Sequence, residues 1–458
     1  MPNRKTRFET DSMGTVEVPQ DALFGAQTQR AVNNFTISRL TMPAAILDAI
    51  IAIKDAAARV NTNCGVLSRE ISNAILDAIE SIPGDDYHRH FPVDIFQTGS
   101  GTSTNMNVNE VIATLACYHS GLEVRANDHV NMSQSSNDVI PTSIRIAAAC
   151  ETRRHLLVAL AKLRDTIDDK RQQCGDITKT GRTHLMDAMP ITVSQEMSAW
   201  SAQVSLAIGR FECVLPQLEA LPIGGTAIGT RINTPDGYIE GMVETLGRRL
   251  DMQFSPVSNY FEAISTQDVA VELSGHLRSC VISLMKIAND LRWMNSGPLT
   301  GLGEIELEAL QPGSSIMPGK VNPVIPEAVI MAAAQVIGND QTIATGGQGG
   351  NFQLNTMLPV IAYNLMQSIE LTGNSAIALA DKAIAGFTIA EAHINENVNR
   401  NPILVTVLNP VIGYQKAAEI AKIAYRENRP ILDVAEEVTD MSRQELEKLL
   451  DPKRLTKS

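Results

Sequence analysis

Residues 262–294 read "EAISTQDVAVELSGHLRSCVISLMKIANDLRWM" and predict one long helix. Their apolar side chains recur at intervals of three or four, which is the repeat of one helix face, at Leu273, Leu277, Val281, Leu284, Ala288 and Leu291. A helix of about 32 residues would be about 48 Å long. A stripe that persists over so many turns is typical of a helical bundle.

Further segments have the same helical repeat, at residues 141–172, 192–218, 323–345 and 354–385. Long helices that are joined by loops with glycine and proline predict an elongated bundle. Because one chain does not cover all the apolar faces of such helices, we expect oligomerisation through the bundle.

The parts of the chain outside these segments predict shorter elements. We expect a short strand pair near residues 8–19 and short helices at residues 413–425, 431–438 and 442–450. The predicted domains are a mixed, mainly helical N-terminal domain, a central long-helix bundle and a small helical C-terminal domain, over residues 1–135, 136–391 and 392–458.

The composition narrows the class of protein. Of the 458 residues, 44% are apolar but only 4% are aromatic, which favours helices over strands. The net charge of −13 repels phosphate backbones and predicts no nucleic-acid partner. Six scattered cysteines without a C-x-x-C motif argue against a metal site or a disulfide framework. Since no apolar run resembles a signal peptide or a membrane span, we expect a cytoplasmic protein without membrane contact.

Polar segments rich in glycine, serine and asparagine interrupt the helical pattern, at residues 98–110, 127–142, 181–192 and 312–327. Each precedes a helical repeat, and free N–H groups at a helix start favour a bound anion. Together the segments predict a site for a small dicarboxylate. The alternative is that they are helix caps and turns, which prefer the same residues.

Single residues in these segments do not decide between the two interpretations. Lys320 is either a solvated surface lysine or a fixed cation for a carboxylate. His184 is one of eight histidines, and its spacing does not distinguish it from the others. Without a G-x-S-x-G motif, acyl transfer is not indicated, although Ser314 could act as a base if nearby N–H groups stabilised its alkoxide. The residues alone therefore predict an anion-binding helical enzyme.

The segment "GSSIMPGKVNP", residues 313–323, closely resembles the signature loop of the aspartase/fumarase superfamily. The segments "GSGTSTNMNVNE", "NMSQSSNDVIPTS" and "GRTHLMDAMPITVSQE" agree with it, and the resemblance covers nearly the whole chain. The motifs "FGAQTQR", "GGTAIGT" and "GGNFQLN", at residues 24–30, 224–230 and 349–355, resemble class II fumarases.

Some features of the sequence keep other functions open. The segment "VNPVIPE", residues 321–327, is more similar to aspartases, and "SGPLTGLGE", residues 296–304, lacks the Arg-Cys pair common in fumarases. The alternative is therefore an aspartate ammonia-lyase. A catalytically silent relative is a third class, against which the retained Ser314, His184 and Lys320 argue.

The resemblance implies an all-α fold with an elongated central five-helix bundle and smaller N- and C-terminal domains. It implies a homotetramer with 222 symmetry whose active sites each combine segments of three chains. The implied activity is the reversible trans-addition of water to fumarate, giving L-malate, a step of the tricarboxylic acid cycle. The family needs neither a metal nor an organic cofactor for it.

The resemblance also implies roles for single residues. Ser314 would be the base on a mobile loop, His184 would activate water, and Glu327 would pair with His184. Lys320 and Asn322 would bind the carboxylate on which negative charge builds. Further contacts to the substrate carboxylates and the water are implied for Ser100, Gly101, Thr102, Ser135, Ser136, Asn137, Thr183, Ser315 and Val321.

Fumarases have a second, peripheral anion site around a His-Pro-Asn-Asp tetrapeptide. The corresponding residues here are Arg125, Ala126, Asn127 and Asp128. Arginine replaces the histidine, and because a guanidinium binds a carboxylate bidentately, an anion site at this position stays a prediction.

Overall fold

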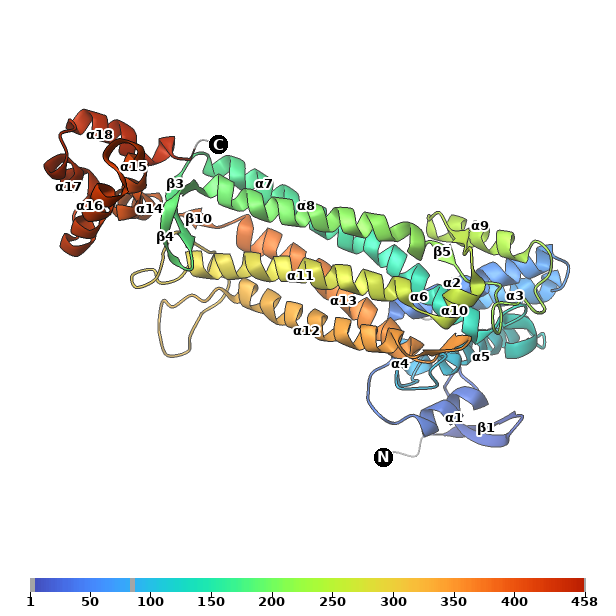
Figure 1. The fold of residues 1–458 in the computed structure, drawn as a ribbon. Coiled ribbons are helices and arrows are strands. Elements are labelled where there is room, and N and C mark those ends of the chain that lie inside the picture. Colours follow the sequence, from blue (N-terminus) through green and yellow to red (C-terminus); the bar gives the residue numbers. More distant parts are fainter. Residues whose placement is uncertain (1–4, 83–86, 457–458) are drawn as a thin grey trace. The chain divides into compact units, whose positions relative to one another are not determined.

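The computed structural model describes residues 5–82 and 87–456 of the chain, and long helices dominate these residues. Each sheet among the described residues has only two strands. The all-α class is therefore confirmed (Figure 1). In the described part of the chain, none of the helices combines the length and the hydropathy needed to cross a bilayer.

The predicted long helices are present with small differences at their ends. The structure has α6 Ser136–Glu151, the π-helical turn η3 Thr152–Leu156, α7 Leu157–Cys174, α8 Val193–Leu218, α11 Asp268–Met294, α12 Val324–Gly347, α13 Leu358–Leu379 and the π-helical turn η4 Ala380–Ile384. Over residues 141–172 the predicted helix is continuous, because η3 joins α6 directly to α7.

The prediction of one helix over residues 262–294 is wrong at its start. A short helix, α10 Tyr260–Ser265, ends at Thr266, whose backbone is extended with φ −122° and ψ 171°. The predicted start of the helix over residues 354–385 also differs, because Leu354–Asn355 form strand β9. The Asn355 side chain donates to the carbonyl oxygens of Gly346 and Gly347 and accepts from the N–H of Met357, so it links two helix ends.

Apart from two helices of 20 and 19 residues in the N-terminal part, the remaining elements are short. The N-terminal part has β1 Thr6–Asp11, β2 Gly14–Pro19, α1 Ala26–Asn34, α2 Ala44–Asn63, α3 Arg69–Glu80, α4 Tyr87–His90, α5 Thr102–Ser120 and η2 Ala126–Val130. Between the long helices lie β3 Thr178–Thr183, β4 Met186–Thr192, β5 Ala220–Leu221, α9 Tyr238–Leu250, β6 Ser255–Pro256, β7 Ile305–Glu306 and β8 Gly350–Asn351. The C-terminal part has β10 Thr388–Ile389, α14 Glu391–Arg400, η5 Pro402–Leu408, α15 Asn409–Ile412, α16 Tyr414–Glu427, α17 Ile431–Val438, α18 Arg443–Leu450 and η6 Pro452–Arg454. The predicted strand pair and the three C-terminal helices are confirmed.

The chain divides into two compact units, and each contains parts of the long helices. The first unit is Met1–Val158, Ile208–Val281 and Ala334–Gly373, and the second is Ala159–Ala207, Ile282–Ala333 and Asn374–Ser458. The predicted division near residues 136 and 391 stays a prediction.

In the first unit, α2 is buried on nearly all sides and contacts α3, α6 and α9. Polar contacts join the long helices of this unit, since Ser274 on α11 donates to Asp340 on α12 at 2.7 Å. Asn339, next on α12, donates to Ser368 on α13 at 3.1 Å. These helices run alongside one another within the unit (Figure 1).

In the second unit, Trp200 on α8 donates to Asp290 on α11 at 3.0 Å. The C-terminal helices have a small apolar core of their own, to which η5 and α16–α18 contribute Leu404, Leu408, Ile420, Val434 and Leu446. Such a core explains why the short amphipathic repeats near the end of the sequence form helices.

Glu110 on α5 holds the start of α1 in the first unit. Its carboxylate accepts from the backbone N–H groups of Gly25, Gln27 and Thr28 at 2.9, 2.9 and 3.1 Å and from the Thr28 hydroxyl at 2.6 Å. These are N–H groups for which a helix start has no partner of its own.

We predict that Glu110→Ala weakens α1 locally, because several donors lose their acceptor. The free energy of local opening should fall by about 1–3 kcal/mol, measured by hydrogen exchange of the amides in residues 25–34. Glu123→Ala, which removes an exposed glutamate from an ion pair with Arg125, serves as the control and should leave this exchange unchanged. Equal protection in the two variants would contradict the role of Glu110.

Candidate active site

In the first unit, the polar segment 98–110 forms the start of α5. Gly101 has φ 72° and precedes the first helical residue, Thr102. A Cβ at Gly101 would come within 2.9 Å of the Ile140 side chain on α6, so the starts of α5 and α6 lie next to each other. The Ser100 and Thr102 hydroxyls are hydrogen-bonded at 2.8 Å. Two adjacent helix N-termini favour an anion between them.

The second polar segment forms a capping box at the start of α6. The Ser135 hydroxyl accepts from the N–H of Asn137 at 3.2 Å, and the Asp138 carboxylate accepts from the N–H of Ser135 at 2.9 Å. The other Asp138 oxygen accepts from the N–H groups of Gly224 and Thr226. Burial raises the pKa of Asp138 to about 6, against the lowering effect of these hydrogen bonds. The segment 135–137 is therefore fixed to the "GGTAIGT" motif.

A buried lysine lies behind this segment, and the sequence analysis missed it. Lys54 on α2 is fully buried, and its Nζ donates to Asn105 Oδ1, Asn131 Oδ1 and Gln134 Oε1 at 2.7, 3.0 and 2.9 Å. Burial lowers the pKa of Lys54 to about 7, and the Asp138 charge opposes this shift. The signal was a lone lysine within the apolar run "AILDAIIAIKDAAARV", residues 45–60.

In the second unit, Thr183 and His184 lie at the tip of the β3–β4 hairpin. The two turn residues, His184 and Leu185, have φ 57° and 62°, and Thr183 pairs with Met186. This two-residue turn exposes the histidine. Within the described residues, no hydrogen bond or ion pair joins the His184 ring to another side chain, Glu327 included, so their pairing stays a prediction.

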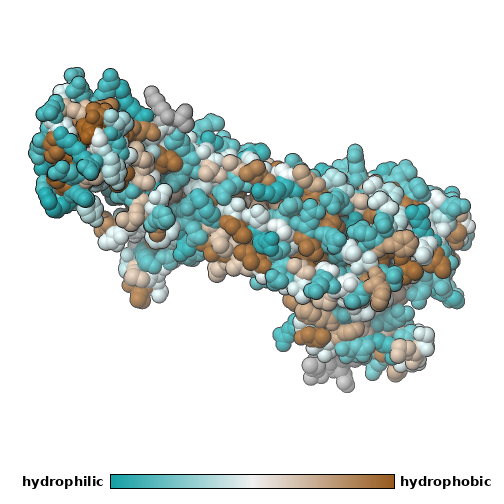
Figure 2. All heavy atoms as spheres, in the orientation of Figure 1, coloured by the Kyte–Doolittle hydropathy of each residue, from teal (hydrophilic) through white to brown (hydrophobic). Residues whose placement is uncertain are grey.

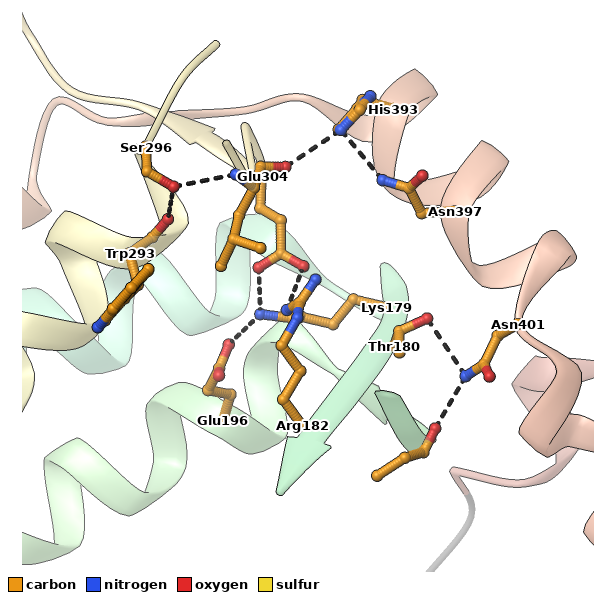
Figure 3. A network of polar contacts seen from close by, with 12 residues as sticks. Lys179, Thr180, Arg182, Glu196, Trp293, Ser296, Glu304, His393, Asn397 and Asn401 are labelled. Atoms are coloured by element: carbon orange, nitrogen blue, oxygen red, sulfur yellow. Dashed lines mark hydrogen bonds and ion pairs between the residues drawn. The ribbon is translucent and has the colours of Figure 1, made fainter. Parts of the chain in front are cut away.

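Buried ion pairs hold the base of this hairpin (Figure 3). Lys179 on β3 donates to Glu304 at 2.6 Å and to Glu196 on α8 at 2.7 Å, and Arg182 reaches the other oxygen of Glu304 at 2.7 Å. On β4, the carbonyl oxygen of Ala188 accepts from Asn401 at 2.8 Å. Sequence reasoning missed these partners, although "TKTGRT" and "GLGE" contain the charged residues.

The loop 312–323 closes on itself. The N–H of Gly313 donates to the carbonyl oxygen of Lys320 at 2.9 Å, and the Asn322 amide donates to the carbonyl oxygen of Gly313 at 2.8 Å. A Cβ at Gly313 would lie 2.3 Å from the Lys320 oxygen, so only glycine fits there. The Lys320 ammonium donates to Asn322 Oδ1 at 2.8 Å. The exposed site residues that were predicted in this loop and in the first turn of α12 are Ser315, Lys320, Val321 and Glu327.

Ser314 lies inside this loop with its oxygen hydrogen-bonded. Its Oγ accepts from the N–H groups of Ile316 and Met317 at 3.2 and 3.1 Å. Backbone donors that point at an oxygen stabilise negative charge on it. The geometry is therefore compatible with a serine that acts as a base.

The structure thus brings the predicted residues together in two groups. Ser100, Gly101, Thr102, Ser135, Ser136 and Asn137 belong to the first unit, and Thr183, His184, Ser314, Ser315, Lys320, Val321, Asn322 and Glu327 belong to the second. Among the described residues, no cluster of three or more His, Cys, Asp or Glu side chains suited to a metal ion is found.

The predicted second anion segment has its arginine already paired. Arg125 precedes η2, and its guanidinium contacts Glu123 at 2.9 Å and Asp128 at 3.4 Å. The hydrogen bonds to Glu123 and Asp128 raise the pKa of Arg125. Since an anion would compete with two carboxylates, binding at Arg125, Ala126, Asn127 and Asp128 stays a prediction.

Comparisons with known proteins show the family of the chain. Residues 14–338 match a family described as "Lyase", and residues 404–457 match "Fumarase C C-terminus". The chain is 57% identical over 451 residues to fumarate hydratase class II 2 of Pseudomonas aeruginosa, which covers 98% of each chain. It is 54% identical over 450 residues to fumarate hydratase class II of Xylella fastidiosa strain Temecula1, which covers 98% of this chain and 95% of the other.

Solved structures are similar as well. The recombinant class II fumarase from Schistosoma mansoni has a TM-score of 0.95 and 35% identity, covering 98% of this chain and 99% of that one. A fumarate lyase:delta crystallin from Brucella melitensis in native form has a TM-score of 0.90 and 39% identity, covering 98% of this chain and all of that one.

We predict that Glu304→Ala destabilises the hairpin base, because Lys179 and Arg182 lose a buried partner. The free energy of unfolding should fall by about 3–5 kcal/mol, measured from thermal or urea unfolding. The double variant with Lys179→Met should recover part of the loss, since it removes the uncompensated ammonium. Glu306→Ala, at an exposed site nearby, is the control. A loss no larger than in this control would show that the pairs contribute little.

Proposed function

The chain belongs to the lyase family and, within it, to the class II fumarate hydratases. We therefore propose that it catalyses the reversible trans-addition of water to fumarate, giving L-malate. This makes it a hydro-lyase with small dicarboxylate substrates. The observation that supports this function most is the full-length match together with a signature loop whose serine oxygen accepts two backbone hydrogen bonds.

In the dehydration direction, Ser314 Oγ as the alkoxide takes a proton from the carbon next to one carboxylate of malate. The electron pair of the broken C–H bond moves into that carboxylate, which becomes a dianionic aci-carboxylate. The Lys320 ammonium donates one proton to Asn322, so two protons remain for other hydrogen bonds. Together with N–H groups of the loop, the ammonium binds this dianion. One preorganised donor of this kind contributes about 2.7–4 kcal/mol to lowering a barrier.

His184 supplies the second proton transfer. The C–O bond breaks as the imidazolium protonates the departing hydroxide, and in hydration the neutral imidazole takes a proton from water. An imidazole suits this role because its charge changes near neutral pH. Glu327 pairs with His184 and tunes its proton affinity. Since these side chains supply both base and acid, the reaction needs neither a metal ion nor an organic cofactor.

We also propose that four chains form a homotetramer whose active sites each combine three chains. Figure 2 shows hydrophobic residues among hydrophilic ones along the surface of the long helices. In the second unit, Leu206, Ile282 and Met331, on α8, α11 and α12, are 62%, 50% and 68% exposed. A neighbouring chain would bury these side chains and could bring Glu327 to His184. The cellular role would be the fumarate hydration step of the tricarboxylic acid cycle in the cytoplasm.

Aspartate ammonia-lyase is the second candidate, and the segment "VNPVIPE", residues 321–327, favours it. Both reactions release fumarate from a four-carbon dicarboxylate by the same proton abstraction, so the loop alone does not separate them. Loss of fumarate absorbance in water alone, without further loss on adding ammonium, would decide for the hydratase.

We predict that Ser314→Ala abolishes most turnover without preventing substrate binding. The loss of a general base should lower kcat about 10²- to 10⁴-fold, while the KM for malate changes little. The measurement is the rise of fumarate absorbance with malate as substrate. Ser255→Ala, at an exposed serine outside the predicted site, is the control. Turnover by Ser314→Ala at the rate of the control would remove Ser314 from the mechanism.

We predict a particle of four chains, each of 49.6 kDa, by light scattering. A Leu206→Glu, Met331→Glu double variant should dissociate it and lose activity, because charges replace apolar side chains in the interface. Tyr118→Glu changes an exposed side chain on α5, which is 83% exposed, and should leave the mass unchanged. A double variant with unchanged mass would place the interface elsewhere.

A further inference from the structure

Lys54 is a buried cation that the proposed mechanism does not use. A buried lysine is costly unless each of its protons finds an acceptor. Here all three do, in the side-chain oxygens of Asn105 at 2.7 Å, Gln134 at 2.9 Å and Asn131 at 3.0 Å. These acceptors are neutral amides, so the ammonium has no carboxylate as a direct hydrogen-bond partner within the described residues.

The lysine fixes which way the Asn105 amide points. An ammonium only donates, so the atom of Asn105 that faces Lys54 is its oxygen. The Asn105 nitrogen therefore points the other way and donates to Asn131 Oδ1 at 3.1 Å and to Ser136 Oγ at 3.0 Å. Asn131 cannot reverse this polarity, because its oxygen also accepts from Lys54.

Ser136 is thereby made an acceptor toward the protein interior. Its Oγ accepts from Asn105, and its own hydroxyl proton has no acceptor among the residues that the structure describes. Ser136 is the first residue of α6 and is partly exposed. A free hydroxyl proton at a helix start can be donated to an anion.

We propose that Lys54 and Asn105 are positioning residues that orient the Ser136 hydroxyl, so that it donates its proton to a substrate carboxylate. The inference rests on the proposed function, because it takes a dicarboxylate as the substrate. Lys54 acts through two hydrogen bonds and touches no substrate itself. Each donor in such a chain polarises the next, which strengthens the final bond to an anion.

The electrostatic surroundings support this role. The charged group that acts on Lys54 is Asp138, whose carboxylate is held by backbone N–H groups of Ser135, Gly224 and Thr226. The direct partners of the ammonium are amides, so it polarises Asn105 and, through it, Ser136 by hydrogen bonds, while the Asp138 carboxylate balances its net charge.

Asn105→Asp tests the proposal, because it preserves the size of the side chain and the acceptor for Lys54 but replaces the donor to Ser136 by an acceptor. The Ser136 proton must then turn inward to the new carboxylate, and the substrate loses a donor. The KM for fumarate should rise about 10- to 150-fold, as for the loss of a hydrogen bond to a charged group, with a smaller change in kcat. The Kd of succinate, an unreactive dicarboxylate, should rise similarly in calorimetry.

The control is Asn107→Asp, at a buried asparagine on the same helix that donates to the carbonyl oxygen of His90 and not to this network. It should leave KM and the Kd of succinate near their wild-type values. A purely structural role of Asn105 predicts equal effects of the two changes, together with a lower unfolding midpoint.

A double-mutant cycle with Ser136→Ala distinguishes an effect on the Ser136 hydroxyl from a general perturbation of the fold. In the Ser136→Ala background, Asn105→Asp should raise KM by less than about threefold, because the hydroxyl that it redirects is absent. The same rise in both backgrounds would overturn the proposal. If Asn105→Asp does not fold, Ser136→Ala alone decides, and an unchanged Kd of succinate overturns the proposal.

The two proposals fail in different ways. A wild-type chain that does not hydrate fumarate overturns the proposed function and this inference with it. A wild-type chain that hydrates fumarate, with an Asn105→Asp variant whose KM and Kd of succinate are unchanged, overturns this inference alone.

Discussion

A lysine ammonium inside a protein is costly unless it is hydrogen-bonded to acceptors, and this constraint shapes polar segments of both units. In the first unit, Lys54 gathers side chains from α5 and from the segment before α6 around one buried point. In the second unit, Lys179 gathers Glu196 and Glu304 at the base of the β3–β4 hairpin. Segments that are rich in serine, asparagine and glycine would otherwise have many conformations. The hydrogen bonds to Lys54 and Lys179 restrict them.

The conformation of the loop 312–323 is restricted without a buried charge. Its ends are joined by backbone and side-chain hydrogen bonds between Gly313, Lys320 and Asn322, while the residues between them are largely exposed. Because the close approach of Gly313 to the Lys320 oxygen excludes any Cβ, the glycine is needed for the shape of the loop. The three prolines and the two backbone hydrogen bonds to Ser314 Oγ restrict the backbone further.

Much of the fold could be predicted from the sequence, because helical periodicity is local. The stripe from Leu273 to Leu291 indicated α11, and the C-terminal repeats indicated α16–α18. The break at Thr266 and the strand at Leu354 could not be predicted. The strand depends on a hydrogen bond from Asn355 to the end of α12. The polar segments were found by composition and by their resemblance to a known family. Lys54, Asn105 and Glu304 were missed, because their roles depend on contacts between residues that are far apart in the sequence.

Lys54 and Lys179 differ in a way that bears on function. Lys179 is paired with two carboxylates, which cancel its charge and make it suitable for holding a hairpin together. Lys54 has only amide oxygens as direct partners, which satisfy its protons and transmit its polarisation through Asn105 to Ser136. An anion at the start of α6 would benefit from the second arrangement and gain nothing from the first. In an acidic protein of net charge −13, a dicarboxylate is bound best by hydrogen-bond donors that already point toward it. In the proposed network, Lys54 orients such a donor at Ser136 through Asn105 without touching the anion itself.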